Sequence, residues 1–211
     1  MKYKNIIFDL DGVLVFTDEY HYVAWKAVAD SIGIALDETI NNRLRGVSRM
    51  ESLEIILSYS DCKFTDAEKR TFALDKNEIY KGYLNNLKPE SISSETLQML
   101  DTLKAMGKKM AIGSSSKNAE FILDKTDITH YFSAIVGGNS ITKTKPDPEV
   151  FLLAAKLLSS DSKDCLVVED AHAGIEAACA GGFDCVGIGD AYNSNFATYR
   201  VKNISEILDI V

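Results

Sequence analysis

The sequence predicts an α/β fold, and three observations point to it. Short apolar segments rich in β-branched residues run directly into Asp, Gly or Ser, which is typical of buried parallel strands. Segments with the apolar spacing of helices lie between these strands, and a block with only helical patterns follows the first strand. Strand–helix alternation around one helical insertion predicts a Rossmann-like, doubly wound parallel sheet core with an inserted α-helical cap domain.

The strands of the core are expected wherever several apolar residues follow one another. The first covers 4–8 and leads directly into Asp9. The other strands are expected at 109–113, 134–136, 165–168 and 185–188. Core helices are expected at 93–106, 148–158 and 171–180, with end signals at Gly107, at Pro148 and at Gly181-Gly182.

The cap is expected in the segment 17–88, which contains no convincing strand pattern. Its helices are expected near 17–32, 37–43, 48–59 and 65–87. Prolines stand only at 89, 146 and 148, so the connections between the blocks must be short and ordered. We therefore predict a core of residues 1–15 and 92–211 and a helical cap domain of residues 16–91.

The charge of the chain limits its partners. Lys plus Arg number 23 and Asp plus Glu number 31, which leaves a net charge of −8. A surface of this sign repels nucleic acid and anionic membranes, so neither is an expected partner. An anionic ligand would need a local basic cluster or a metal ion.

The sequence also predicts where the protein resides. No stretch approaches the roughly 20 apolar residues that span a bilayer, and the N-terminus lacks a long apolar run, so we expect a cytoplasmic protein. The four cysteines show no C-x-x-C spacing, and we expect buried free thiols in a reducing compartment: Cys62, Cys165, Cys179 and Cys185.

Polar residues at the ends of the predicted strands predict a phosphoryl-transfer site. In an open α/β sheet the active site lies at the carboxyl ends of the strands. The residues expected there are Asp9, Asp11, the serines at 114–116, Glu169 and Asp170, with Lys145 in a loop before the fourth strand. Hard carboxylate oxygens suit Mg²⁺, which completes its shell with water and phosphate, while lysine and hydroxyl groups bind the remaining phosphate oxygens.

Two aspartates separated by one residue can perform different chemistry. One carboxylate can attack phosphorus, and the other can donate a proton to the leaving oxygen. Gly12 lets the backbone turn sharply behind them. Taken alone, Asp9 and Asp11 could be turn residues, the serines could cap the next helix, and Lys145 could be a solvated loop residue.

Four segments in this order resemble the motifs of the haloacid dehalogenase superfamily. Phe8-Asp9-Leu10-Asp11-Gly12 resembles the first motif, and Ser115 or its neighbour Ser114 resembles the second. Lys145-Pro146-Asp147-Pro148 resembles the third, and Glu169-Asp170 the fourth. The resemblance covers nearly the whole chain and implies a Mg²⁺-dependent enzyme that passes through an aspartyl phosphate.

A closer resemblance is to the β-phosphoglucomutase family. It rests on the segments 17–21, 45–49 and 114–118 together with Trp25-Lys26. It implies interconversion of β-glucose 1-phosphate and glucose 6-phosphate through β-glucose 1,6-bisphosphate, with one Mg²⁺ per chain. The chain departs from the family pattern at Phe16, where an acidic residue is usual, and at Arg45, where lysine is common.

The resemblance also implies a role for each site residue. Asp9 would carry the phosphoryl group and Asp11 would be the general acid and base, while Ser114 and Lys145 would hold the transferring group. The metal ligands would be Asp9, the backbone carbonyl of Asp11, Glu169 and Asp170. Arg49 would bind the distal phosphate. The other expected substrate-binding residues are His21, Arg45, Gly46, Lys76, Ser115, Ser116, Lys117 and Asn118.

Two other functions remain open at this stage. A sugar-phosphate phosphatase of the same superfamily would use the same residues and pass the phosphoryl group to water. A catalytically silent phosphosugar-binding regulator is disfavoured by the complete set of Asp9, Asp11, Lys145 and Asp170. We expect a monomer that acts on a hexose phosphate.

Overall fold

The computed structural model describes residues 2–211, which contain a six-stranded sheet in the order β3-β2-β1-β4-β5-β6. Every neighbouring pair of strands is parallel. The doubly wound α/β fold is therefore confirmed. The strands are β1 (Asn5–Phe8), β2 (Lys109–Gly113), β3 (Ala134–Val136), β4 (Cys165–Glu169), β5 (Asp184–Gly187) and β6 (Tyr199–Arg200).

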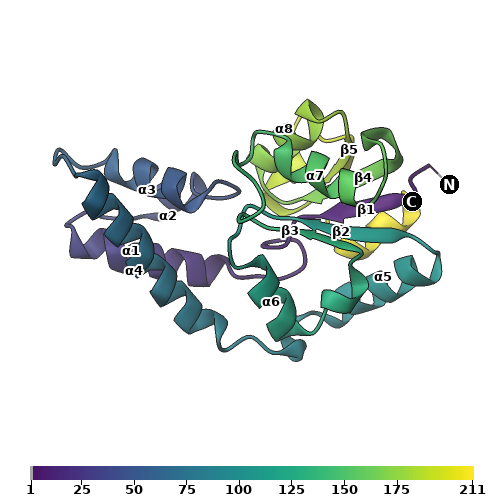
Figure 1. Ribbon diagram of the computed structural model, residues 1–211, viewed down its shortest axis with the longest axis horizontal. Helices are drawn as coiled ribbons and strands as arrows, with labels where there is room; N and C mark the ends of the chain where they lie inside the picture. Colours follow the sequence, from purple (N-terminus) through teal and green to yellow (C-terminus); the bar gives the residue numbers. More distant parts are fainter. Residues whose placement is uncertain (1) are drawn as a thin grey trace.

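Helices cover both faces of this sheet, because alternate residues of each strand point to opposite sides. Ile6 and Phe8 of β1 pack in one cluster with α5 (Ser94–Ala105) and α6 (Ala119–Thr126). The intervening Ile7 packs in a second cluster with helices α7 (Glu149–Leu157) and α8 (His172–Ala180). Figure 1 shows these two helix pairs on opposite sides of the sheet.

The remaining four helices, here called the cap helices, lie beside the sheet (Figure 1). They are α1 (Asp18–Ser31), α2 (Glu38–Asn42), α3 (Arg49–Leu57) and α4 (Asp66–Leu84). Trp25, Leu53 and Ile56 belong to a third apolar cluster, which these helices and the loops between them form. This separate cluster supports a cap domain, and its boundaries at residues 15/16 and 91/92 stay a prediction.

Helix caps explain where two of the cap helices begin. Ser48 precedes α3, and its side chain accepts a hydrogen bond from the Glu51 N–H. In return, the Ser48 N–H donates to the Glu51 side chain. Thr65 and Glu68 form the same reciprocal arrangement before α4. Such capping boxes satisfy backbone donors that a helix start otherwise leaves unpaired.

Some elements differ from the sequence-based prediction. The strand β6 has only two residues, too few to produce an apolar pattern, and α6 follows a serine-rich segment that hides its start. The helix expected at 65–87 ends at Leu84 and is followed by a short 3₁₀ turn at Pro89–Ser91. Within residues 2–211, no helix has both the length and the apolar character needed to cross a membrane.

The cysteine prediction is only half right. Cys165 and Cys185 are buried free thiols in β4 and β5, as expected. Cys62 and Cys179, however, are exposed. Cys62 lies in the loop between α3 and α4, and Cys179 lies beside the buried face of α8, whose alanine-rich sequence gives little contrast between its faces.

Candidate active site

Three neighbouring strands bring the predicted site residues to one edge of the sheet. Strand β1 lies between β2 and β4, and Phe8 is in register with both Ile112 and Val168. The residues just beyond these strand ends are therefore neighbours. Asp9, Ser114 and Asp170 all lie there and border one cavity of about 360 Å³.

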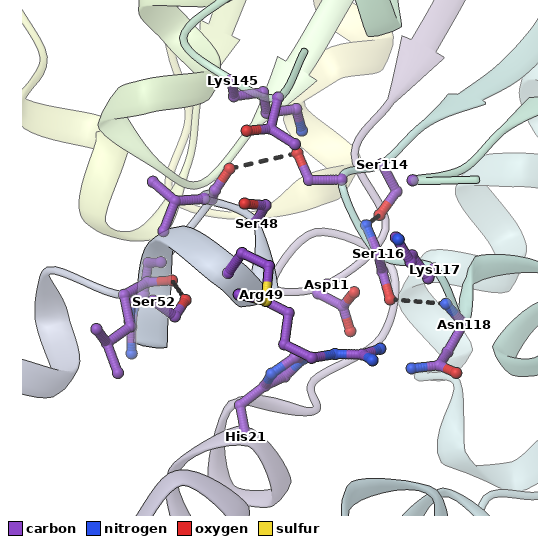
Figure 2. A pocket seen from close by; sticks show the side chains of 18 of the residues that line it. Asp11, His21, Ser48, Arg49, Ser52, Ser114, Ser116, Lys117, Asn118 and Lys145 are labelled. Carbon is purple, nitrogen blue, oxygen red and sulfur yellow. Dashed lines mark hydrogen bonds between the residues drawn. The ribbon is translucent and has the colours of Figure 1, made fainter. Parts of the chain in front are cut away.

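The cap helices close the other side of this cavity (Figure 2). Every predicted site residue except Glu169 lines it. From the core these are Asp9, Asp11, Ser114, Ser115, Ser116, Lys117, Asn118, Lys145 and Asp170, and from the cap His21, Arg45, Gly46, Arg49 and Lys76.

Lys145 is the buried cation on the core side of the cavity. Its side chain is 1% exposed, and its Nζ lies 2.5 Å from Asp9 Oδ1 and bonds to Glu169 as well. The two carboxylates raise the pKa of Lys145 against the opposing effect of burial, so the ammonium stays charged. Lys145 is thus fixed beside Asp9, where an incoming phosphoryl group would meet it.

Glu169 lies behind Lys145 and does not itself line the cavity. One carboxylate oxygen bonds to Lys145, and the other accepts from the Ala171 N–H at 2.9 Å. The residue is fully buried, and a Cβ at Gly174 would lie 2.0 Å from its carboxylate. Glu169 therefore holds Lys145 in this structure, and its role as a metal ligand stays a prediction.

The acidic side of the cavity fits a divalent cation. Asp170 lies beside the other carboxylates and has no hydrogen bond to a lysine. Burial, and to a lesser extent the charges of Glu169 and Asp9, raises the pKa of Asp170 to about 9. Residues 2–211 contain no group of three His, Cys, Asp or Glu side chains placed to hold a metal by themselves. Mg²⁺ needs no such cage, since it keeps several waters and accepts backbone and phosphate oxygens. The carboxylates at this side of the cavity outnumber the cations beside them, and such oxygen atoms are the ligands that Mg²⁺ prefers.

Gly12 makes the close approach of these carboxylates sterically possible. Its φ is +84°, and a Cβ there would lie 2.1 Å from Asp170 Oδ2. Any side chain at this position would displace Asp170 from the cavity edge.

Asp11 is held by residues that the motif does not include. Thr17 Oγ1 donates a hydrogen bond to Asp11 Oδ1, and Tyr80 Oη donates to Thr17 Oγ1 at 3.1 Å. Burial raises the pKa of Asp11, and the Thr17 hydrogen bond opposes this change. A carboxyl group that retains its proton more readily than usual suits a general acid.

The serines following β2 serve two purposes. Ser114 is buried, and its Oγ accepts from the Ser116 N–H at 3.1 Å, while Ser116 Oγ accepts from the Asn118 N–H at 3.2 Å. These two hydroxyls stabilise the turn that leads into α6, but neither caps that helix, whose N-cap is Asn118 and which has no side-chain cap. Ser115 differs, since its hydroxyl donates across the cavity to the Gly46 carbonyl at 3.4 Å.

A second polar group lies farther from Lys145, and Asn77 organises it. Asn77 Oδ1 accepts from Arg49 Nη2 at 2.6 Å and from Asn118 Nδ2 at 3.1 Å. Figure 2 shows the Arg49 guanidinium and Asn118 beyond Asp11 as seen from Lys145. Asn77 was not predicted, although helical spacing from Ala73 and Tyr80 places it close to the face of α4 that bears Lys76.

Arg45 is predicted to bind substrate, but its terminal nitrogens are occupied by protein carboxylates. It pairs with Asp190 of the core and, at 3.2 Å, with Asp18 at the start of α1. Gly46 beside it approaches the core closely, since a Cβ there would lie 2.8 Å from Ala171 Cβ. The loop before α3 therefore seals the cavity against the core.

Lys76 and His21 form a buried pair on the cap side. Lys76 Nζ lies 2.8 Å from His21 Nδ1 and 4.2 Å from the centre of the Tyr80 ring. Burial, assisted by the charge of Arg49, lowers the pKa of Lys76 to about 7. Burial, assisted by Lys76, also lowers the pKa of His21, so this imidazole is neutral and can accept a hydrogen bond from the Lys76 ammonium.

This pair predicts proton uptake when a phosphate ligand binds. At pH 8 most Lys76 is neutral, and a dianion in the cavity raises its pKa, so binding should take up about one proton. Calorimetry with inorganic phosphate or hexose phosphate in buffers of different ionisation enthalpy measures this number. Lys76→Met should abolish the uptake, whereas Lys81→Met, in the same helix but with a side chain that is 44% exposed, should keep it. Equal uptake in Lys76→Met would refute the assignment.

Comparisons with known proteins identify the family of the chain. A family profile of haloacid dehalogenase-like hydrolases matches residues 6–188. A β-phosphoglucomutase of Bacillus subtilis is 41% identical over 206 residues, which cover 97% of this chain and 91% of that protein. A fructose-1-phosphate phosphatase of Escherichia coli is 31% identical over 191 residues, which cover 89% of this chain and 97% of that protein.

The solved structures place the chain in the same group. A β-phosphoglucomutase from Clostridium difficile superposes with a TM-score of 0.91 at 35% identity and covers 97% of this chain and 93% of its own. The resemblance drawn from the four motifs is thereby confirmed. The chain belongs to the haloacid dehalogenase-like hydrolase family.

Proposed function

We propose that this protein is a Mg²⁺-dependent β-phosphoglucomutase, which interconverts β-glucose 1-phosphate and glucose 6-phosphate through β-glucose 1,6-bisphosphate. One observation carries the proposal: the cavity offers two places for phosphate. Asp9, Ser114 and Lys145 form the first, and the group around Arg49 and Asn118 forms the second. A mutase must present either end of a bisphosphate to one nucleophile, so it needs both places. The 41% identity to a β-phosphoglucomutase supports the same reading.

In this proposal Asp9 is the nucleophile. An oxygen of its carboxylate forms a bond to phosphorus while the bond from phosphorus to the sugar oxygen breaks, and Asp11 gives its proton to that oxygen. In the reverse direction Asp11 takes the proton from the sugar hydroxyl that attacks the aspartyl phosphate. Lys145 and Ser114 bind the oxygens of the transferring group, whose charge they help to stabilise.

The magnesium ion would be held by the side chains of Asp9 and Asp170 and by the backbone carbonyl of Asp11. When bound, it supplies positive charge that reduces the repulsion between the Asp9 carboxylate and an anionic phosphoryl group. Glu169 contributes indirectly through its bond to Lys145.

Arg49 is suited to the distal phosphate. Its planar guanidinium can grip two phosphate oxygens at once. Asn77 accepts a hydrogen bond from it and is itself held by Asn118. When the sugar turns between the two half-reactions, the phosphate that leaves Arg49 enters the place beside Asp9. Closure of the cap over the cavity keeps water away from the aspartyl phosphate during this exchange.

A phosphatase is the second candidate, because the fructose-1-phosphate phosphatase of Escherichia coli is 31% identical over most of both chains. The two functions differ in whether sugar or water accepts the phosphoryl group. The deciding assay supplies β-glucose 1-phosphate with a trace of β-glucose 1,6-bisphosphate and measures glucose 6-phosphate and inorganic phosphate in parallel. The mutase forms glucose 6-phosphate with almost no phosphate released, whereas phosphate release at a comparable rate would overturn the proposal. α-Glucose 1-phosphate in a parallel reaction tests the anomer.

A further inference from the structure

One arginine joins three separate parts of the chain. Arg45 lies in the loop between α2 and α3, and its guanidinium pairs with Asp190 in the turn after β5. The same guanidinium lies 3.2 Å from Asp18, the first residue of α1. A single side chain thus connects a cap loop, the segment that leads from the core into the cap, and the core itself.

The surroundings of Arg45 show that the two carboxylates fix its position. Its side chain is 28% exposed, whereas those of Asp18 and Asp190 are 40% and 51% exposed. Among the buried side-chain nitrogen and oxygen atoms of residues 2–211, only the Nε of Arg45 lacks a hydrogen-bond partner. Leaving a buried donor unpaired is unfavourable, so the two ion pairs must hold the guanidinium there.

These ion pairs depend on a closed cap. Asp190 belongs to the core and Arg45 to the cap, so their contact is lost if the cap helices move away from the sheet. An interaction present in one of two states shifts the equilibrium toward that state. Three contacts beside the cavity have the same dependence, namely Ser115 with Gly46, Thr144 with Glu51 and Asn118 with Asn77. Each of them is a hydrogen bond from an uncharged donor.

We propose that Arg45 is a positioning residue, which through Asp190 and Asp18 holds the cap closed and thereby directs the phosphoryl group to sugar instead of water. The second part of this statement rests on the proposed mutase function, and the first part does not. A partly exposed ion pair is weak, so its loss should lower the ratio of closed to open enzyme only about two- to fivefold. This is enough to change how often water reaches the aspartyl phosphate.

The two exposed cysteines allow cap closure to be measured without catalysis. Cys62 lies in the cap and Cys179 in the core, whereas Cys165 and Cys185 are buried and protected from labelling. Spin labels on the exposed pair report the distribution of cap–core distances in the full-length protein. The variants are Arg45→Gln, Asp190→Asn and the double variant, together with Arg45→Lys.

The matched control is Lys69→Gln. Lys69 pairs with Glu54 at 2.8 Å, and its side chain is 24% exposed, close to the value for Arg45. Both partners of this pair lie on cap helices, so its loss removes an ion pair without affecting the contact between cap and core. We expect the distance distribution and the kinetics of this variant to match the wild type.

The proposal predicts a particular pattern among the variants. Arg45→Gln and Asp190→Asn should each increase the open fraction by about two- to fivefold, and the double variant should be no worse than the more affected single variant. Arg45→Lys should retain most of the closure. The differences should disappear near 1 M salt, where the screening length falls to about 3 Å. In the coupled assay, the two single variants should release more inorganic phosphate per glucose 6-phosphate formed.

Other outcomes would overturn the proposal in separable ways. If Arg45 binds the substrate directly, Arg45→Gln impairs catalysis and Asp190→Asn leaves both distances and kinetics unchanged. Additive effects of the two substitutions would also refute the ion-pair mechanism. If wild type itself proves to be a phosphatase, the proposed function fails, but the distance measurements still decide whether Arg45 holds the cap closed.

Discussion

Replacing Asp9 by asparagine should abolish turnover and leave the protein at least as stable as before. The amide has nearly the same shape but cannot form the bond to phosphorus, so we expect a loss of at least about 10⁴-fold. Acid-quenched protein should show a phosphoryl adduct by intact mass in the wild type and none in the variant. A matched control is Asp184→Asn, at the opposite end of the sheet, where the carboxylate accepts from Tyr3 Oη at 2.6 Å.

The stability part of this prediction follows from the burial of Asp9. Burial, with the charges of Glu169 and Asp11, raises the pKa of Asp9 to about 8 although Lys145 opposes the change. A carboxyl whose pKa rises on folding costs stability as pH increases through that range. In the absence of Mg²⁺, the melting temperature of Asp9→Asn should therefore equal or exceed that of the wild type at pH 8. Turnover within tenfold of wild type would show that the nucleophile is another residue.

Replacing Lys145 by methionine should cost both stability and activity. Lys145 is the direct cationic partner of two buried carboxylates, Asp9 and Glu169. Removing one partner of a buried charge cluster typically costs about 3–5 kcal/mol. Because the lysine also stabilises charge on the transferring group, we expect turnover to fall at least about 100-fold.

The pH dependence separates this explanation from a general packing defect. Without the ammonium, the pKa of Asp9 rises further, so the variant loses stability as pH increases and recovers it as this carboxyl group becomes protonated. Chemical denaturation at pH 5 and pH 8 should show a larger deficit at pH 8. Lys108→Met is the control, since Lys108 is also buried but its Nζ donates only to the Tyr3 carbonyl at 2.6 Å. An equal deficit at both pH values would contradict the ion-pair explanation.

Much of the core and its site could be predicted from local patterns. A buried strand is an apolar run, and the first polar residues after it mark the strand end, so Asp9, Ser114 and the pair Glu169-Asp170 could be placed at one edge. The two capping boxes similarly mark the starts of α3 and α4. In contrast, β6 is too short to show any pattern, and the alanine-rich α8 concealed that Cys179 is exposed.

The cap side of the site could be predicted less well, because its residues act through partners distant in sequence. Asn77 was missed, since an asparagine on a polar helix carries no signal until Arg49 and Asn118 approach it. Arg45 was expected to bind substrate, and only the position of Asp190, 145 residues away, shows what occupies its guanidinium.

By itself, the sequence determined the α/β fold, the helical insertion and the set of chemical groups at the strand ends, because periodicity and strand termini are local properties of the chain. Only the tertiary structure decided which of two adjacent carboxylates faces the cavity. Glu169 turns toward Lys145 while Asp170 borders the cavity, and this choice depends on a lysine delivered by the loop between β3 and α7. Charges interact through space, so their partners are set by how the loops and the cap meet and not by the residues beside them in the chain.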